Sequence, residues 1–287
     1  MMSNVVVFGA SGQLGQCLKD FTDKNGISTV YFPSEAEANI LDDAALTKVF
    51  ETYKPDFSIN CAAYTAVDKA EDDRELALKI NKTGVENIAR HCKASGSALV
   101  HISTDFIFKG DRPTPRNEDA IAEPVNVYGQ TKLDGELAVK AILDKYFIIR
   151  TGWLYSEYGN NFVKTMLKLG AERDELKIVA DQTGTPTYAM DLAACIMHVI
   201  SVNSSDYGVY HYSNEGIASW YDFAKAIFDL SGTKVKALPV KTSEYVTKAL
   251  RPAYSVMDKS KIKQTFNMEI PYWRDSLSIC IDRLKTI

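Results

Sequence analysis

"NVVVFGASGQLG", residues 4–15, runs from a short apolar segment straight into a turn with glycines at positions 9, 12 and 15. Such a turn suits the first strand-to-helix junction of a dinucleotide-binding unit. Residues without a Cβ let the backbone approach a pyrophosphate, and the N–H groups that open the helix face the anion. Three glycines alone are weak evidence, and a merely structural turn is the alternative. Their place directly after the first apolar run favours nucleotide binding by Gly9, Gly12 and Gly15.

Apolar runs and segments of helical period alternate through the first half of the chain, a pattern typical of a parallel sheet with crossover helices. The runs are rich in branched and aromatic residues, which suits strands that are buried on both faces. The predicted strands are 4–8, 28–32, 56–60, 97–102 and 146–150, and the predicted helices are 13–24, 42–53, 73–94 and 128–144. The sequence therefore predicts an α/β fold with a Rossmann-type, doubly wound parallel sheet.

In the second half of the chain, apolar runs and segments of helical period alternate less regularly, and the pattern predicts a smaller domain. Its expected strands are 176–181 and 208–213, and its expected helices are 188–200, 219–230 and 273–285. We expect residues 1–150 to form a dinucleotide-binding Rossmann domain. Residues 151–287 are expected to form mainly a substrate-binding domain, with room for one or two elements to return to the first domain.

Composition narrows the class of protein. Of the 287 residues, 46% are hydrophobic and 24% charged, and the net charge is −4 without a basic block, which disfavours nucleic-acid binding. The N-terminus enters a strand directly and no run of about 18 apolar residues occurs, so we expect a cytoplasmic protein without a membrane span. The five scattered cysteines lack a C-x-x-C pair, which favours buried thiols over disulfides or zinc.

Hydroxyl and carboxyl side chains follow the fourth predicted strand, in "HISTDFIFKG". Ser103, Thr104 and Asp105 thereby emerge at the carboxyl end of a parallel strand, the edge of an open sheet where ligands lie. Simple turn formation is the alternative for Ser103 and Thr104.

A tyrosine and a lysine four residues apart open the next predicted helix, in "NVYGQTKLDGE" (126–136). The spacing places Tyr128 and Lys132 on one helix face. Reduction of a ketone needs a proton at oxygen, and a phenol can donate it if the lysine ammonium lowers its pKa. The same spacing recurs at Tyr221 and Lys225, where no glycine turn or hydroxyl-bearing strand end precedes it, so we interpret that pair as an aromatic residue and a solvated charge.

The motifs together resemble the extended short-chain dehydrogenase/reductase superfamily. The residues within and around these motifs resemble the dTDP-4-dehydrorhamnose reductase family of this superfamily through nearly the whole chain. The motifs that carry this resemblance are "FGASGQLG", "NCAAYTAVDKAE", "STDFIFKG", "NVYGQTKLDGE", "RTGWLYSEYGNNFVKTML", "DQTGTPTYAMDLA", "GVYHYSNEG" with "SWYDFA", and "RPAYSVMDKSK".

This resemblance implies reduction of the C4 ketone of dTDP-4-dehydro-L-rhamnose with NADPH or NADH. It implies Tyr128 as proton donor, Lys132 as its partner and Thr104 as the hydroxyl that tunes the site. The implied substrate contacts are Thr104, Asp105 and Trp153; a core aromatic is the alternative for Trp153. The implied cofactor contacts are Gly9, Gly12, Gln13, Leu14, Gly15, Asn39, Ile40, Ala62, Ala63, Tyr64, Thr65, Tyr128 and Lys132. For Ile40, packing into the core is the alternative.

Two departures from the family's pattern bear on cofactors. Some relatives place magnesium at a dimer interface between carboxylates, but the corresponding helices here offer Cys17 and only Asp191, so we expect no metal and a monomer or homodimer. The second predicted strand ends at Phe32 and Pro33 without the acidic residue that favours NAD, which leaves NADH and NADPH both open.

Other functions and contacts stay open at this point. A nucleotide-sugar epimerase or dehydratase, and a non-catalytic regulatory subunit of the same fold, are the alternative functions. Arg251 and Asn161 are candidate diphosphate contacts, with structural hydrogen bonds at the domain junction as the alternative.

Overall fold

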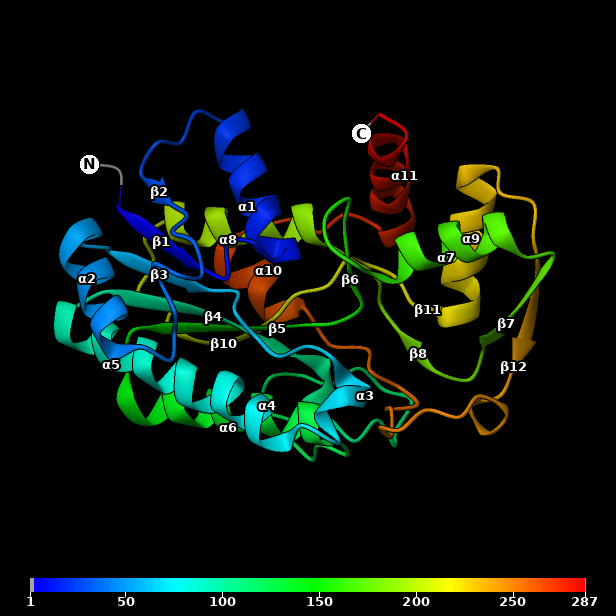
Figure 1. Cartoon of the computed structure of the whole chain (residues 1–287), viewed down its shortest axis with the longest axis horizontal. Helices are drawn as coiled ribbons and strands as arrows, with labels where there is room; N and C mark the ends of the chain where they lie inside the picture. Colours follow the sequence, from blue (N-terminus) through cyan, green and yellow to red (C-terminus); the bar gives the residue numbers. More distant parts are fainter. Residues whose placement is uncertain (1–2, 287) are drawn as a thin grey trace.

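A computed structural model describes residues 3–286, and a six-stranded parallel sheet runs through its centre (Figure 1). The strand order is β10-β5-β4-β3-β1-β2, and every neighbouring pair is parallel, with Val7 of β1 opposite Ile59 of β3. The strands are β1 (Val5–Phe8), β2 (Val30–Tyr31), β3 (Phe57–Asn60), β4 (Ala98–Thr104), β5 (Tyr146–Thr151) and β10 (Gly208–His211). The five strands predicted in the first half are confirmed.

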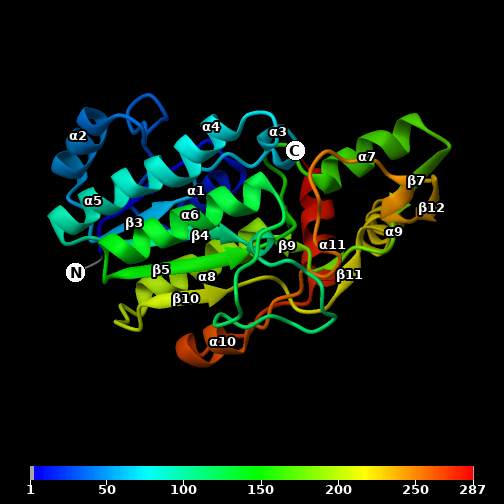
Figure 2. The same cartoon turned by 90° about the horizontal axis from the view of Figure 1, so that it is seen from below.

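Helices cover both faces of the sheet, because alternate residues of each strand point to opposite sides. Val5 and Val7 of β1 belong to one apolar cluster, Val6 and Phe8 to the other. Helices α1 (Gln13–Lys24), α8 (Ala189–Ser201) and α10 (Ser260–Phe266) contribute to the first cluster, and α2 (Asp43–Tyr53), α5 (Val85–Ser95) and α6 (Val127–Ile142) to the second (Figure 2). The predicted doubly wound, Rossmann-type α/β sheet is therefore confirmed.

The predicted helix 73–94 has a break in its middle. It consists of α4 (Arg74–Leu78), a π-helical turn (Lys79–Gly84) and α5, and the short α3 (Val67–Ala70) precedes it. The wider turn buries Asn81 completely, although an asparagine amide must find hydrogen-bond partners when it is buried. Such π-turns are frequent at functional sites, and this one faces the site described below.

The second half of the chain builds a separate apolar cluster around Tyr155, Phe223 and Trp273. Figure 1 shows this lobe to the right of the large sheet. Its strands are β6 (Leu154–Tyr155), β7 (Glu175–Val179), β8 (Thr183–Gly184), β9 (Thr187–Tyr188), β11 (Ala218–Ser219) and β12 (Lys236–Val240), and its helices are α7 (Phe162–Glu172), α9 (Trp220–Ser231) and α11 (Trp273–Leu284). The predicted strand at 176–181 and helices at 219–230 and 273–285 are confirmed, whereas α7, β12 and the two-residue strands β6, β8, β9 and β11 were not predicted.

Three elements from the second half lie on the large sheet. β10 pairs with β5, α8 packs against α1, and α10 contributes Ile262 and Phe266 to the cluster beneath them. The predicted strand 208–213 and helix 188–200 correspond to β10 and α8. The division of the chain into domains at residue 150 stays a prediction.

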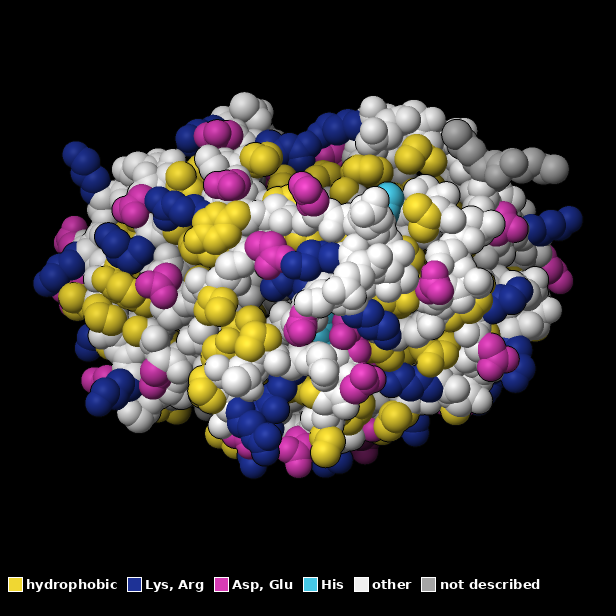
Figure 3. All heavy atoms as spheres, turned by 180° about the vertical axis from the view of Figure 1, so that it is seen from behind, with side chains coloured by type: hydrophobic (Ala, Val, Ile, Leu, Met, Phe, Trp, Pro, Cys, Tyr) yellow, Lys and Arg dark blue, Asp and Glu magenta, His cyan; other side chains and the backbone are white. Residues whose placement is uncertain are grey.

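The surface carries both signs of charge. Figure 3 shows lysine and arginine side chains interspersed with aspartate and glutamate over one whole face. Within residues 3–286, no helix is both long and apolar enough to cross a membrane.

Candidate active site

The turn before α1 packs so closely that two of its glycines have no room for a side chain. Gly9 has a φ of +78°, and a Cβ there would lie 2.6 Å from Ala62 N. Gly12 N donates to Gly9 O (3.1 Å), which closes the turn, and a Cβ on Gly15 would lie 2.7 Å from Ala10 Cα. Gly12 has no side chain to cap α1, and the first N–H groups of a helix have no partner inside it. The start of α1 therefore keeps uncapped N–H groups, and their binding to a cofactor pyrophosphate stays a prediction.

The two residues that open α1 take different places. Leu14 is 5% exposed and packs in the core, so a cofactor would meet it through its backbone. The Gln13 side chain forms hydrogen bonds with residues of the second lobe. Its Oε1 accepts from Ser156 Oγ (3.0 Å) and Asn161 Nδ2 (2.8 Å), and its Nε2 donates to Leu154 O (3.3 Å). Asn161, a candidate diphosphate contact, therefore follows its structural alternative.

Residues 62–65 follow β3 at the same edge of the sheet. Ala62 N donates to Asn60 Oδ1 (3.0 Å), and Asn81 clamps Tyr64 by accepting from its N (2.8 Å) and donating to its O (3.1 Å). Asn81 Nδ2 also donates to Thr131 Oγ1 on α6 (3.1 Å), so one buried amide ties this strip to the helix that carries Tyr128. Ala63, which is partly exposed, and Thr65, which is exposed, complete the strip. Sequence reasoning missed Asn81, because an asparagine within a helical pattern gives no signal of burial.

The predicted adenine neighbours differ in exposure. Asn39 is exposed, and its Oδ1 accepts from Leu41 N (3.0 Å). Ile40 is 7% exposed and packs in the core, where a Cβ on Gly84 would strike it. The core alternative therefore describes the Ile40 side chain.

The structure brings Thr104, Asp105 and Tyr128 together at the carboxyl edge of the sheet. Thr104 Oγ1 donates to Asp105 Oδ1 (3.1 Å) and accepts from Phe106 N (3.2 Å). The Phe106 ring meets the Tyr128 ring edge-on at 5.7 Å between centroids. Asn126 caps α6 by accepting from Gly129 N (2.8 Å), which fixes the helical turn that carries the phenol.

Burial dominates the electrostatics of Tyr128. It raises the pKa of the phenol to about 12, and a hydrogen bond with Thr104 offsets part of this effect. The expectation that Lys132 lowers the Tyr128 pKa is therefore wrong for the chain alone. The Lys132 ammonium donates instead to Ile102 O (2.7 Å) on β4.

Lys132 is itself buried, with 2% of its surface exposed. Burial lowers its pKa to about 8, and Glu136, one helical turn further along α6, opposes this shift. The fully buried Glu136 carboxylate accepts from Ser103 Oγ (2.6 Å) and from Arg150 Nε (2.9 Å) and Nη2 (2.8 Å). Sequence reasoning missed Glu136 and Arg150; the only signal was the i, i+4 spacing of Glu136 from Lys132.

The loop after β5 presses against Asp105. A Cβ on Gly152 would lie 2.6 Å from Asp105 Cγ, so the backbone runs directly over the carboxyl group. Burial raises the Asp105 pKa to about 6, and hydrogen bonds from Ser255 and Thr104 oppose the shift. Trp153, the next residue of the loop, is partly exposed and stacks on Trp220. Thr104 and Asp105 thus contact each other, and Trp153 follows the glycine that lies against Asp105.

Two other candidates, Lys225 and Arg251, have structural partners. Lys225 pairs with Asp229 (3.9 Å) on the surface of α9, away from the glycine turn, which fits the interpretation of Tyr221 and Lys225 as an ordinary pair. Arg251 donates from both Nη atoms to Asp68 (3.1 and 2.6 Å), so it too follows its structural alternative.

The residues considered for magnesium also have other surroundings. Cys17 is fully buried, and Asp191 accepts from Asn214 Nδ2 (2.6 Å) and Ser276 Oγ (2.5 Å). In the described part of the chain, no three His, Cys, Asp or Glu side chains group as a metal site would require.

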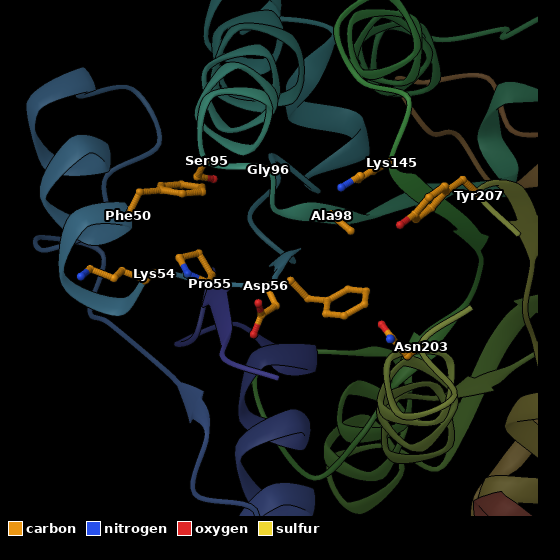
Figure 4. Close-up of a pocket in the computed structure, with 11 residues that line it drawn as sticks. Phe50, Lys54, Pro55, Asp56, Ser95, Gly96, Ala98, Lys145, Asn203 and Tyr207 are labelled. Carbon is orange, nitrogen blue, oxygen red and sulfur yellow. The ribbon is translucent and has the colours of Figure 1, made fainter. Parts of the chain in front are cut away.

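A cavity of about 470 Å³ lies at the opposite, amino edge of the sheet (Figure 4). Phe57, Ala98 and Lys145 line it where β3, β4 and β5 begin, together with Lys54 and Tyr207. The hydroxyl, phenol and ammonium groups described above gather at the carboxyl edge, so this cavity is separate from the candidate active site.

Known proteins resemble the chain over its whole length. Residues 2–286 match the family model described as the RmlD substrate binding domain. The chain is 38% identical over 286 residues to a dTDP-4-dehydrorhamnose reductase of Aggregatibacter actinomycetemcomitans, covering 96% of this chain and 97% of the relative. It is 40% identical over 276 residues to the spore coat polysaccharide biosynthesis protein SpsK of Bacillus subtilis, covering 96% of each.

A solved structure agrees closely with the fold. The crystal structure of dTDP-4-dehydrorhamnose reductase from Bacillus anthracis in complex with NADP has a TM-score of 0.94 and 42% identity, covering 99% of this chain and 100% of that one. The resemblance drawn from the motifs is thereby confirmed: the chain belongs to the family of the RmlD substrate binding domain, the dTDP-4-dehydrorhamnose reductases.

Proposed function

We propose that the protein reduces the C4 ketone of dTDP-4-dehydro-L-rhamnose to give dTDP-L-rhamnose, with NADPH or NADH as reductant. The observation that carries the proposal is the contact series from Tyr128 through Thr104 to Asp105, at the same carboxyl edge of the sheet as the turn at Gly9, in a chain of this reductase family. A phenol, a hydroxyl and a carboxyl group at one point are suited to a sugar ketone and its neighbouring hydroxyls.

The cofactor is proposed to lie between the glycine turn and Lys132. Gly9, Gly12 and the N–H groups of Gln13 and Leu14 would hold the pyrophosphate, residues 62–65 the central part, and Lys132 the nicotinamide ribose. When bound, the reduced nicotinamide supplies the hydride. NADPH finds support in the NADP complex of the Bacillus anthracis relative.

Tyr128 is proposed to donate the proton to the ketone oxygen. Its phenol is partly exposed at the carboxyl edge of the sheet, and its pKa of about 12 keeps the proton on the oxygen until a substrate takes it. The Thr104 hydroxyl, whose hydrogen bond lowers the Tyr128 pKa, is proposed to stabilise the phenolate that remains and the charge that develops on the ketone oxygen. Asp105 and Trp153 are proposed to hold the sugar.

The test is a turnover assay with dTDP-4-dehydro-L-rhamnose, run with NADPH and NADH in parallel. We expect oxidation of at least one cofactor and formation of dTDP-L-rhamnose. Tyr128→Phe should lower turnover at least a hundredfold and leave cofactor affinity within about threefold. No turnover with either cofactor would refute the proposal. NAD that remains tightly bound through purification, without consumption of added NADH, would favour an epimerase or dehydratase; an unchanged Tyr128→Phe variant would favour a regulatory subunit.

Beyond the nucleotide sugar, the proposed partner is at most a second copy of the chain, and the proposed location is the cytoplasm. Light scattering of the purified protein distinguishes the monomer from the homodimer. Fractionation of the host cell tests the location, because a membrane-bound pool would contradict it.

A further inference from the structure

We propose that Trp220 is a positioning residue that holds the Trp153 indole as the apolar wall of the sugar site. The inference rests on the proposed function, since the sugar is the group that the wall would meet. Trp220 lies in the second lobe, 67 positions along the sequence from Trp153, at the first residue of α9.

Trp153 has an unusual backbone. Its φ is +50°, in the left-handed region that bulky side chains rarely adopt. Gly152, the residue before it, presses against Asp105, and Trp153 O accepts a hydrogen bond from Thr187 N (3.1 Å). Surrounding structure must therefore keep Trp153 in this conformation, as is common where side chains are aimed into sites.

The indole of Trp153 fills a narrow slot. One side is the Trp220 ring, whose centroid is 3.5 Å away and whose plane is inclined by only 4°. At its edge is Gly184 of β8, where a Cβ would lie 2.6 Å from Trp153 Cε2 and 2.7 Å from Nε1. A stacked ring on one face and a glycine at the edge fix both the position and the tilt of the indole.

Trp220 is itself firmly held. It follows Ser219, which forms a capping box with Asp222: Asp222 N donates to Ser219 Oγ (3.0 Å), and Ser219 N donates to Asp222 Oδ2 (2.9 Å). The Phe162 ring of α7 packs against it at 4.7 Å between centroids. Trp220 therefore connects the core of the second lobe to the Trp153 loop and limits the movement of the Trp153 indole.

The same loop leads to the reacting groups. Gly152 contacts Asp105, Asp105 accepts from Thr104, and Thr104 adjoins the Tyr128 phenol. A displaced indole would thus change how the sugar rests against these groups. The nicotinamide and pyrophosphate contacts proposed at Gly9 and Lys132 lie outside this series, so the effect should fall on the sugar.

The kinetic test compares Trp220→Leu, Trp220→Phe and the matched control Trp273→Phe. Trp273 is buried in the core of the same lobe, edge-on to Phe223 at 5.9 Å. We expect Trp220→Leu to raise the KM for the keto sugar at least tenfold with a smaller change in kcat and an unchanged cofactor KM. Trp220→Phe, which keeps a ring to stack, and Trp273→Phe should stay within about threefold of the wild type. A Trp220→Leu enzyme within twofold of the wild type, or a Trp220→Phe enzyme as impaired as Trp220→Leu, would overturn the inference.

A spectroscopic test is independent of turnover. The chain has three tryptophans, so Trp220→Phe/Trp273→Phe and Trp220→Leu/Trp273→Phe each leave Trp153 alone. We expect the leucine variant to show red-shifted emission and at least twofold stronger acrylamide quenching, because the indole is no longer held. Equal spectra would overturn the inference. A wild type that shows no turnover while the spectra differ as expected would refute the proposed function and leave the role of Trp220 in holding Trp153 standing.

Discussion

Replacement of Lys132 by methionine should make the chain more stable while it removes activity. The lysine is 2% exposed, and burial lowers its pKa from 10.5 to about 8. At 1.36 kcal/mol for each unit, keeping the ammonium charged in the fold costs about 3 kcal/mol at pH 7. Loss of the hydrogen bond to Ile102 O would cost about 1 kcal/mol. We therefore expect Lys132→Met to raise the free energy of unfolding by about 2 kcal/mol.

The sign of the effect depends on pH in a way that can be checked. The unfolded chain keeps the lysine protonated up to about pH 10.5, whereas the folded chain releases the proton from about pH 8. The unfolded state thus binds more protons between these values, and the stability of the wild type should rise with pH across that window. The advantage of Lys132→Met should be complete below pH 8 and shrink as the pH rises toward 10.5.

Urea unfolding at pH 7 and pH 9.5 measures this advantage, with Lys225→Met as the matched control. Lys225 is 47% exposed, so its replacement should change the stability by less than about 0.5 kcal/mol at either pH. A Lys132→Met variant less stable than the wild type at pH 7, or an advantage that does not shrink at pH 9.5, would refute the reasoning. Turnover should fall at least a hundredfold, since the nicotinamide ribose loses its proposed ligand Lys132 and is no longer positioned.

Three further predictions concern the surroundings of this lysine and the glycine turn. Glu136→Gln should lower the free energy of unfolding, measured in urea, by about 3 to 5 kcal/mol, because it leaves the buried Arg150 unpaired. The double variant Glu136→Gln/Arg150→Met should recover most of this loss. If it does not, the loss does not come from the ion pair. The Asp105 pKa is raised from 3.8 to about 6, so the folded chain keeps a proton that the unfolded chain releases. This group should therefore lower the free energy of unfolding by about 3 kcal/mol as the pH rises from 4 to 6. An Asp105→Asn variant with the same pH dependence as the wild type would contradict this prediction. Gly9→Ala should weaken NADPH binding at least tenfold in a fluorescence titration, because the new Cβ meets Ala62 N at 2.6 Å. The control Gly26→Ala has a similar φ of +65° but open space around the new Cβ, and it should bind NADPH like the wild type. Equal weakening in both variants would assign the effect to backbone strain alone.

The parts of the fold that the sequence predicted well are those with a strong local signal. Helix α1 begins at Gln13 and ends at Lys24 as predicted, because a glycine turn precedes it and apolar residues recur at helical spacing. Strand β1 is buried at every residue and appears as the continuous apolar run "VVVF", whereas β3 is equally buried although it reads "FSIN". By contrast, β12 reads "KALPV", with a proline and no fully buried residue, and its partner β7 lies more than 55 residues earlier. Only the tertiary pairing identifies such a strand.

Within the candidate site, residue types were easier to predict than their interactions. The order of the motifs led to Thr104, Asp105 and Tyr128, which the structure brings into contact. Neither spacing nor order could predict that the Lys132 ammonium turns toward Ile102 O, because that direction depends on how deeply α6 lies on β4. The sign of the Tyr128 pKa shift was missed for the same reason: burial is a property of the packed helix, and it is the largest cause of the shift.

The burial of Lys132 also explains why its neighbourhood is so polar. A lysine that is 2% exposed keeps its charge only if negative groups face it, and Glu136 is the acidic residue that faces it from α6. That carboxylate is itself fully buried and needs Arg150 and Ser103 to satisfy it. One functional charge at the surface of the sheet thus requires two further buried charges beneath it, contributed by α6 and β5. The segment "YGQTKLDGE" therefore serves two purposes in one helix. Tyr128 and Lys132 are placed for the proposed reaction, and Glu136 is placed so that the lysine can remain an ammonium.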